Sequence, residues 1–204
     1  MSRPVGRSPC SSPCSPTCWP PMTLPDPAAP IVPAATSLSR RTVLMLGGAA
    51  LLAACSPTMP RIETRTPPGQ LSVATMTQTI NAVRRANGAP ALAYNAQLAS
   101  AARFQAERMA SRDTLSHDLG TTLRQRVTEA GYLGAVGENV AAGHKTLEHA
   151  IEGWLNSPSH RFTLLSPNFV EFGLATANTA EGTRSRYGTF WALVMGGSFD
   201  AWRA

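Results

Sequence analysis

Hydrophobic positions in the C-terminal two thirds of the chain repeat first with helical and later with strand spacing. Met76, Ile80 and Val83 recur at i, i+4 and i+7, which predicts one face of an α-helix that stops at residues 87–88, an Asn-Gly pair. Asn95 is a good N-cap, so a second helix is predicted to begin just after it. The inner face predicted for that helix consists of Leu98, Ala101, Ala102, Gln105 and Met109.

Three further helices are predicted. A short one is predicted over about Leu123–Ala130, ending at Gly131. A fourth is predicted to begin at Thr146 and to end before Pro158, because the residue before a proline is displaced from the helical region. A short helix is expected after it. The inward side chains of the fourth helix are Leu147, Ala150, Ile151, Trp154 and Leu155.

Two stretches have the composition of strands instead. Phe169–Thr176 and Tyr187–Met195 are aromatic and β-branched, and the Gly-bearing segment 178–186 between them is predicted to be a hairpin turn. Short edge strands are expected at Val136 and at 91–93. Helices followed by a terminal hairpin predict an α+β fold with helices packed on a small sheet.

The chain divides into five parts. Residues 1–36, which hold ten of the 17 prolines, are predicted to be a disordered and mis-annotated N-terminal extension, with Met22 as an alternative start. We interpret residues 37–55 as a signal peptide and residues 56–71 as a flexible tether. One folded domain is predicted over 72–200, followed by a C-terminal tail at 201–204.

Two features of the predicted signal peptide can be recognised in its sequence. Arg40 and Arg41 precede an apolar run, Val43–Ala54, that is too short to span a bilayer. The arginine pair resembles a twin-arginine export signal, with a Sec-type leader as the alternative. Leu52–Cys55 resembles a bacterial lipobox, which implies that Cys55 is acylated and becomes the first mature residue. The expected partner is therefore the membrane, and the expected location is the periplasmic side of the cell envelope or outside the cell.

Charge and cysteine content exclude two classes of function. The full chain has a net charge of +6, but residues 56–204 hold 14 basic and 11 acidic residues, so only +3 belongs to the domain and tether. No basic run with interleaved aromatic residues occurs, which argues against nucleic-acid binding. No cysteine follows Cys55, so the mature domain has no thiol nucleophile and no thiolate metal site.

Three residues could carry chemistry in the domain. His117 lies in a Ser-His-Asp triplet, Glu138 in Gly-Glu-Asn and His160 in Ser-Pro-Ser-His-Arg. Imidazoles with a carboxylate suit a divalent ion such as zinc. The wide spacing between the three residues favours the alternative, in which they are ordinary polar residues that satisfy loop backbone. No G-x-S-x-G elbow occurs, so the serines beside His160 are more simply helix caps. His144 and His149 are expected at the surface without a function.

Several motifs in this order resemble the CAP superfamily of cysteine-rich secretory proteins, antigen 5 and pathogenesis-related proteins. They are SHD at residues 116–118, GENVAAG at Gly137–Gly143, WLNSPSHRFTLLSPNFVEFGLA at Trp154–Ala175 and YGTFWALVMGG at Tyr187–Gly197. The resemblance covers roughly Ala74–Phe199. It implies a three-layer α-β-α sandwich with a small antiparallel sheet between helices.

The resemblance also implies a cleft lined by two histidines and two acids, which hold zinc or another divalent cation in many members. By motif, His117, Glu138 and His160 are three members of this set and the predicted metal ligands. The fourth position, three residues beyond the tryptophan of the fourth helix, is Ser157 here, so one acid is missing. Asn139 is expected to line the cleft and to hold Glu138 in place.

Two functions follow from this reading. The first is an envelope binding module that takes a lipid or sterol-like, cell-wall glycan or protein ligand through the His/Glu-lined cleft. The alternative is a metal- or His/Glu-dependent, peptidase-like hydrolase, in which a histidine paired with a carboxylate acts as general base. The missing acid and the lack of a nucleophile favour the binding module.

Overall fold

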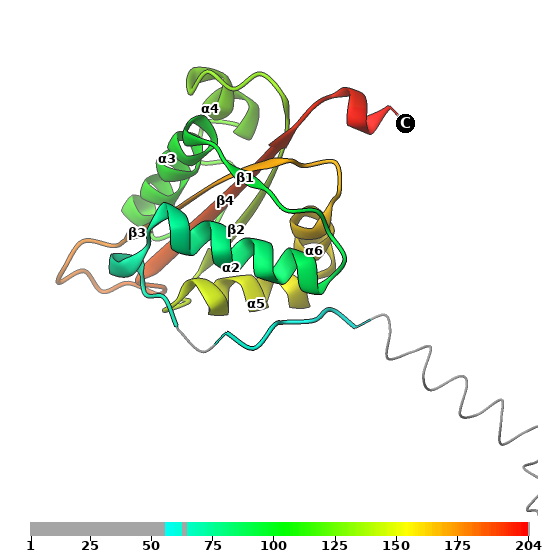
Figure 1. The fold of residues 1–204 in the computed structure, drawn as a ribbon. Helices are drawn as coiled ribbons and strands as arrows, with labels where there is room; N and C mark the ends of the chain where they lie inside the picture. Colours follow the sequence, from blue (N-terminus) through cyan, green and yellow to red (C-terminus); the bar gives the residue numbers. More distant parts are fainter. Residues whose placement is uncertain (1–55, 63–64, 204) are drawn as a thin grey trace, which may run out of the picture. The chain divides into compact units, whose positions relative to one another are not determined.

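The computed structural model describes residues 56–62 and 65–203. The export signal and Cys55 lie outside the described residues. The described part forms five α-helices, which Figure 1 shows around a central sheet. Their bounds are α2 Val73–Ala86, α3 Ala96–Arg112, α4 Leu123–Glu129, α5 Leu147–Asn156 and α6 Pro158–Leu165.

Four strands form one sheet in the order β1-β3-β4-β2, with the bounds β1 Ala93–Tyr94, β2 Ala135–Ala142, β3 Glu171–Asn178 and β4 Thr189–Gly197. β2 and β3 each pair with β4 antiparallel, but β1 pairs with β3 parallel. The sheet is therefore mixed: the predicted antiparallel arrangement is confirmed for β2, β3 and β4 and is wrong only for β1. The long connection between β1 and β3, which includes α3, makes the parallel pairing possible because parallel strands need a crossover rather than a tight turn.

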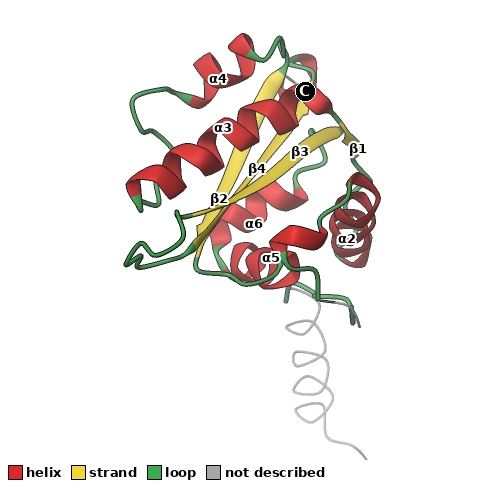
Figure 2. Ribbon diagram, turned by 90° about the vertical axis from the view of Figure 1, so that its left-hand side faces the viewer, coloured by secondary structure: helices red, strands yellow, loops and turns green. Residues whose placement is uncertain are grey.

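The two faces of β4 belong to different hydrophobic cores. Trp191, Leu193 and Met195 pack with side chains of α2, α5 and α6. The alternate residues Phe190, Ala192 and Val194 pack with side chains of α3 and α4. Successive side chains on a strand point to opposite faces, so β4 is buried on both. Figure 2 shows α3 and α4 on one side of the sheet and the other helices behind it, which confirms the three-layer α-β-α sandwich.

Helices α3 and α5 begin directly after the capping residues that were predicted for them. The Asn95 side chain accepts hydrogen bonds from the backbone N–H groups of Gln97 and Leu98, and α3 begins directly after it as predicted. Thr146 caps α5 by accepting from the backbone N–H of His149. Pro158 ends α5 and at the same time begins α6, because a proline in the first turn of a helix loses no hydrogen bond there.

β2 is the element that differs most from its prediction. A short edge strand was expected at Val136, and the structure has an edge strand of eight residues that pairs with β4 along its whole length. Its Gly-Glu-Asn-Val-Ala-Ala sequence has few of the β-branched and aromatic residues that mark a strand. The pairing with the strongly apolar β4 determines its length.

The segment predicted to be a flexible tether packs against the domain where the structure describes it. The backbone N–H of Thr66 donates to Oε2 of Glu148 at 2.8 Å, and the carbonyl of Thr66 accepts from the N–H of Leu147 at 3.0 Å. Met59 and Ile62 pack on the core beside α2 and α5. These contacts attach Met59, Ile62 and Thr66 to the folded part of the chain.

The C-terminal end is also attached. A short 3₁₀-helix, η2, spans Asp200–Trp202, and the Trp202 ring lies against Phe169 with 5.3 Å between ring centroids. A second 3₁₀-helix, η1, spans Pro68–Gln70 before α2.

Candidate functional site

The candidate site lies over the edge strand β2, where the two helical layers meet. Glu138 is opposite Val194, and the next residue, Asn139, is opposite Leu193. Directly opposed residues project from the same face of a sheet. Glu138 therefore points toward the layer of α3 and α4, while Asn139 points toward the layer of α5 and α6.

Glu138 is a buried carboxylate with two partners. Its side chain is 2% exposed; Oε2 lies 2.9 Å from Nδ1 of His117, and Oε1 accepts from Nη2 of Arg126 at 2.5 Å. An unpaired buried carboxylate would be strongly unfavourable, so these two groups are what allow Glu138 to be buried. The histidine partner was expected from the sequence, whereas the arginine was not.

Arg126 also fixes the loop that carries His117. The Arg126 side chain is completely buried, and its Nη1 donates to the carbonyl oxygens of Thr121 at 2.7 Å and of His117 at 3.1 Å. The sequence holds a signal for this role, because Arg126 lies among the apolar positions Leu123 and Val127 of the inward stripe of α4. A charged residue on an apolar stripe indicates a buried pair.

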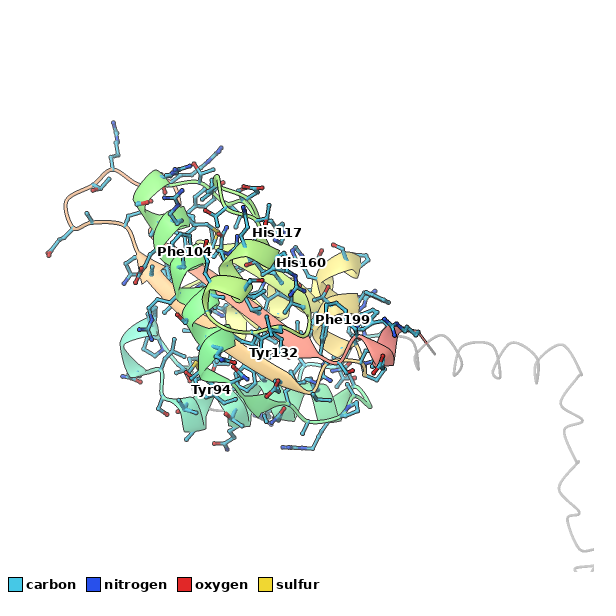
Figure 3. All side chains as sticks on the ribbon, turned by 90° about the horizontal axis from the view of Figure 1, so that it is seen from above. Tyr94, Phe104, His117, Tyr132, His160 and Phe199 are labelled. Carbon is cyan, nitrogen blue, oxygen red and sulfur yellow. The ribbon has the colours of Figure 1, made fainter. Side chains whose placement is uncertain are left out.

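His160 reaches the same place from the other layer. It lies in the first turn of α6, its Nδ1 is 2.9 Å from Oγ of Ser157, and its carbonyl accepts from Nδ2 of Asn139 at 2.9 Å. The His117 and His160 rings are nearly parallel, at 30°, with centroids 6.4 Å apart, and Figure 3 shows them side by side. The structure thus places the five predicted residues near one another, but Asn139 is fully buried and holds the backbone of α6, so the expectation that it holds Glu138 in place is wrong.

The two imidazoles have opposite electrostatic surroundings. The hydrogen bond to Glu138 raises the pKa of His117, and this outweighs the effects of burial and of Arg126. Burial, together with the neighbouring His117, lowers the pKa of His160. Protonation of the pair is therefore ordered, with His117 taking its proton at a higher pH than His160.

The arrangement does not supply the predicted three-ligand metal site. Both Glu138 oxygens are engaged, one by the His117 ring and one by the Arg126 guanidinium, so neither oxygen is left to bind a metal ion. Among the residues that the structure describes, no group of three or more His, Cys, Asp or Glu side chains could hold a metal ion. His117 and His160 remain as nitrogen donors, fewer than the three protein ligands of a catalytic zinc, and the guanidinium of Arg126 adds a positive charge nearby. The residues present do not fit a resident zinc ion.

Glu171, the nearest later acid, does not take the place of the missing carboxylate at Ser157. Its Oε2 accepts from the Tyr132 hydroxyl and its Oε1 from Nδ2 of Asn95, both at 3.0 Å. Burial and this carboxylate raise the pKa of Tyr132 to about 12. Glu171 therefore belongs to a structural contact between β3 and the segments around α3 and α4.

The imidazole pair lies at the surface. The His117 side chain is 58% exposed. Two cavities, of about 720 and 490 Å³, are lined by neither His117 nor His160. The site is thus a polar cluster at the surface.

Comparisons with known proteins agree on the family. The model of the cysteine-rich secretory protein family (CAP) matches residues 77–195. The uncharacterized protein YkwD of Bacillus subtilis (strain 168) is 30% identical over 97 residues, which cover 46% of this chain and 38% of YkwD. This chain therefore spans less than half the length of that relative.

Solved structures show the same fold. An extracellular protein containing an SCP domain from Bacillus anthracis str. Ames superposes with a TM-score of 0.54 at 26% identity, covering 64% of this chain and 43% of that protein. An outer surface protein from Borrelia burgdorferi gives a TM-score of 0.53 at 23% identity, covering 61% of this chain and 91% of that protein. No helix within residues 56–62 and 65–203 has the length and apolar character needed to cross a membrane. The family match covers more than half of the chain, and the protein belongs to the cysteine-rich secretory protein (CAP) family.

Proposed function

We propose that this protein is an exported CAP-domain protein, held in the cell envelope by a lipid on Cys55, and that its domain binds polar ligand groups through His117 and His160. The export signal and lipobox at residues 37–55 support the location. The extracellular protein of Bacillus anthracis and the outer surface protein of Borrelia burgdorferi, which share the fold, are consistent with it.

The main support for the proposal is the pairing of Glu138 with His117 and Arg126. This carboxylate is buried and engaged on both oxygens, so it orients His117 and leaves imidazole nitrogens as the groups that face solvent. Imidazole nitrogens donate to and accept from hydroxyl, amide and carboxylate groups. Cell-wall glycan and protein ligands offer these groups. A lipid or sterol-like ligand needs an apolar cavity, and the two described cavities lie elsewhere.

Sedimentation with purified peptidoglycan tests this function. The full-length protein should sediment with the polymer, and His117→Ala and His160→Ala should each weaken binding about tenfold, the effect of losing roughly 1.4 kcal/mol of hydrogen bonding. His149→Ala, at an exposed position of α5, is the matched control and should bind like the wild type. Equal binding by all four proteins would remove the imidazole pair from ligand recognition.

One observation favours the hydrolase as a second candidate. A histidine whose Nδ1 contacts a buried carboxylate has the geometry of a supported general base. The serine that lies near the site does not complete a catalytic set, because Oγ of Ser157 contacts His160 and not His117. Turnover of peptide, ester or glycan substrates that is present in the wild type and absent in His117→Ala would establish the enzyme instead of the binding module.

A further inference from the structure

Three aromatic side chains are exposed around the segment that follows β4. The relative exposures are 69% for Phe162, 51% for Phe199 and 43% for Trp202. Phe199 and Trp202 are joined by one turn of backbone, since the N–H of Trp202 donates to the carbonyl of Phe199. Phe162 comes from α6 and lines the same groove as Trp202. We call these three residues the aromatic patch.

The groove beside the aromatic patch is also where the chain enters the domain. Its volume is about 720 Å³, and its lining includes the first described residues, Ser56–Thr58, as well as Asn87 at the end of α2. Asn87 holds Thr58 by two hydrogen bonds, from the Thr58 N–H to Oδ1 at 2.7 Å and from Nδ2 to the Thr58 carbonyl at 2.6 Å. In Figure 1, α6, the C-terminal end and the start of the described chain are all on the right-hand side.

Basic side chains accompany the aromatic patch. Arg161 lines the groove, and the Arg124 guanidinium lies over the Phe199 ring at 5.5 Å from its centroid. Arg203 follows Trp202 and pairs with the exposed Asp200 at 3.2 Å. Three arginines and one aspartate leave a positive surface. Exposed aromatic rings with arginines are the combination that binds the interfacial region of an anionic membrane.

We propose that the aromatic patch docks on the phospholipid surface of the membrane that holds the lipid of Cys55. This inference rests on the lipid attachment in the proposed function. Thr58 is fixed at the groove, and three residues of chain span at most roughly 10 Å, so an acylated Cys55 brings this side of the domain to the headgroups. Phe162, Phe199 and Trp202 then enter the interface, and the arginines contact anionic headgroups.

Fluorescence quenching by brominated lipid tests the docking. Trp154 and Trp191 are buried, at 1% and 0% exposure, so Trp202 is the accessible tryptophan of the described chain. The protein isolated with its lipid on Cys55 is reconstituted into vesicles of phosphatidylethanolamine and phosphatidylglycerol that carry acyl-chain bromine, and Trp19→Phe removes the fluorescence of any uncleaved chain. Quenching is expected, and Trp202→Phe should abolish it. Equal quenching in both proteins would overturn the proposal.

Two further variants locate the contact. Phe162→Ser should lower the quenching of Trp202 at least twofold, while Phe104→Ser, an exposed phenylalanine of α3 at 39%, should leave it unchanged. Near-ultraviolet circular dichroism checks that each variant is folded. Equal effects of the two substitutions would overturn the proposal, as would a concentration-dependent dimer that Phe162→Ser dissociates, because the patch would then face a second copy.

Flotation of the same vesicles separates this proposal from the one on which it rests. Protein that floats with unquenched Trp202 would show that the lipid attachment is present and the docking wrong. Protein that neither floats nor is quenched would overturn both. Peptidoglycan binding by His117 and His160 is measured without vesicles, so its failure leaves the quenching result unaffected.

Discussion

At the scale of single residues, the Arg126–Glu138 pair dominates the candidate site. Both side chains are almost completely buried, at 0% and 2% exposure. Arg126→Met removes the cation and leaves a buried carboxylate with His117 alone, which is expected to lower the free energy of unfolding by about 3–5 kcal/mol. Urea denaturation at neutral pH measures the change.

The double variant Arg126→Met with Glu138→Gln separates pairing from packing. Once the carboxylate is neutral, the loss of Arg126 leaves no buried charge, so the double variant should be more stable than Arg126→Met. If the double variant is as unstable as the single one, the guanidinium acts through its hydrogen bonds to the loop carbonyls and not through the charge of Glu138.

The ion pair of His117 with Glu138 predicts a pH dependence. The pKa of His117 is raised in the folded protein, so folding favours its protonated form. The stabilisation is fully present below the unfolded value of about 6.5 and is lost as the pH rises through the folded pKa. His117→Gln should therefore destabilise the domain more at pH 5.5 than at pH 8.5, as measured by thermal unfolding. A difference that is constant with pH would exclude the ion pair.

Motifs located the residues of the site, but not all of their partners. Five polar residues were predicted to lie together, and the structure brings them together. Arg126 and Arg84 were missed, although each lies on the apolar stripe of a helix, where a charge needs a buried partner. Arg84 donates to the carbonyls of Pro90, Leu164 and Ser166, and burial lowers its pKa to about 10. The partners of both arginines are distant in sequence or are backbone atoms, which hydrophobic periodicity does not report.

At the scale of elements, the contact of α6 with β2 places His160. A Cβ atom on Gly137 would lie 2.8 Å from Cζ of Phe169 and 2.9 Å from Cγ2 of Thr163 in α6. Gly137→Ala should therefore push α6 away from β2 and cost about 1–3 kcal/mol of stability in urea denaturation. Gly69→Ala is the matched control, because a Cβ there meets no atom within 4 Å. Equal stability of the two variants would show that α6 adjusts without cost.

Helices were predicted better than strands for a physical reason. A helix cap and an apolar stripe each depend on residues close together in the sequence. Short stretches of sequence were therefore enough to predict the caps Asn95 and Thr146 and the apolar stripes of α2, α3 and α5. β2 owes its length to β4, which lies about fifty residues later, and the parallel pairing of β1 with β3 depends on a crossover. Pairing between strands that are far apart in sequence leaves little trace in the composition of either one.

At the scale of the whole molecule, the site exists only because two helical layers pack on the two faces of one sheet. His117 precedes α4 in one layer, His160 belongs to α6 in the other, and both reach over the edge strand that carries Glu138. The order of the sequence motifs predicted that His117, Glu138 and His160 belong to one site. Neither spacing nor composition indicates that Glu138 faces one helical layer and Asn139 the other.

The N-terminal segment joins this architecture through Glu148, and this contact can be tested in solution. Glu148 is 1% exposed and accepts from the Thr66 backbone, so the segment before α2 is held against α5. Hydrogen bonds to charged groups contribute about 1.5–3 kcal/mol, so Glu148→Ala should increase local opening, and hence tryptic cleavage after Arg65, at least tenfold. Glu152→Ala, an exposed glutamate on the same helix, should cleave like the wild type. Identical cleavage in all three proteins would mean that apolar packing of Met59 and Ile62, and not the hydrogen bond to Glu148, holds the segment.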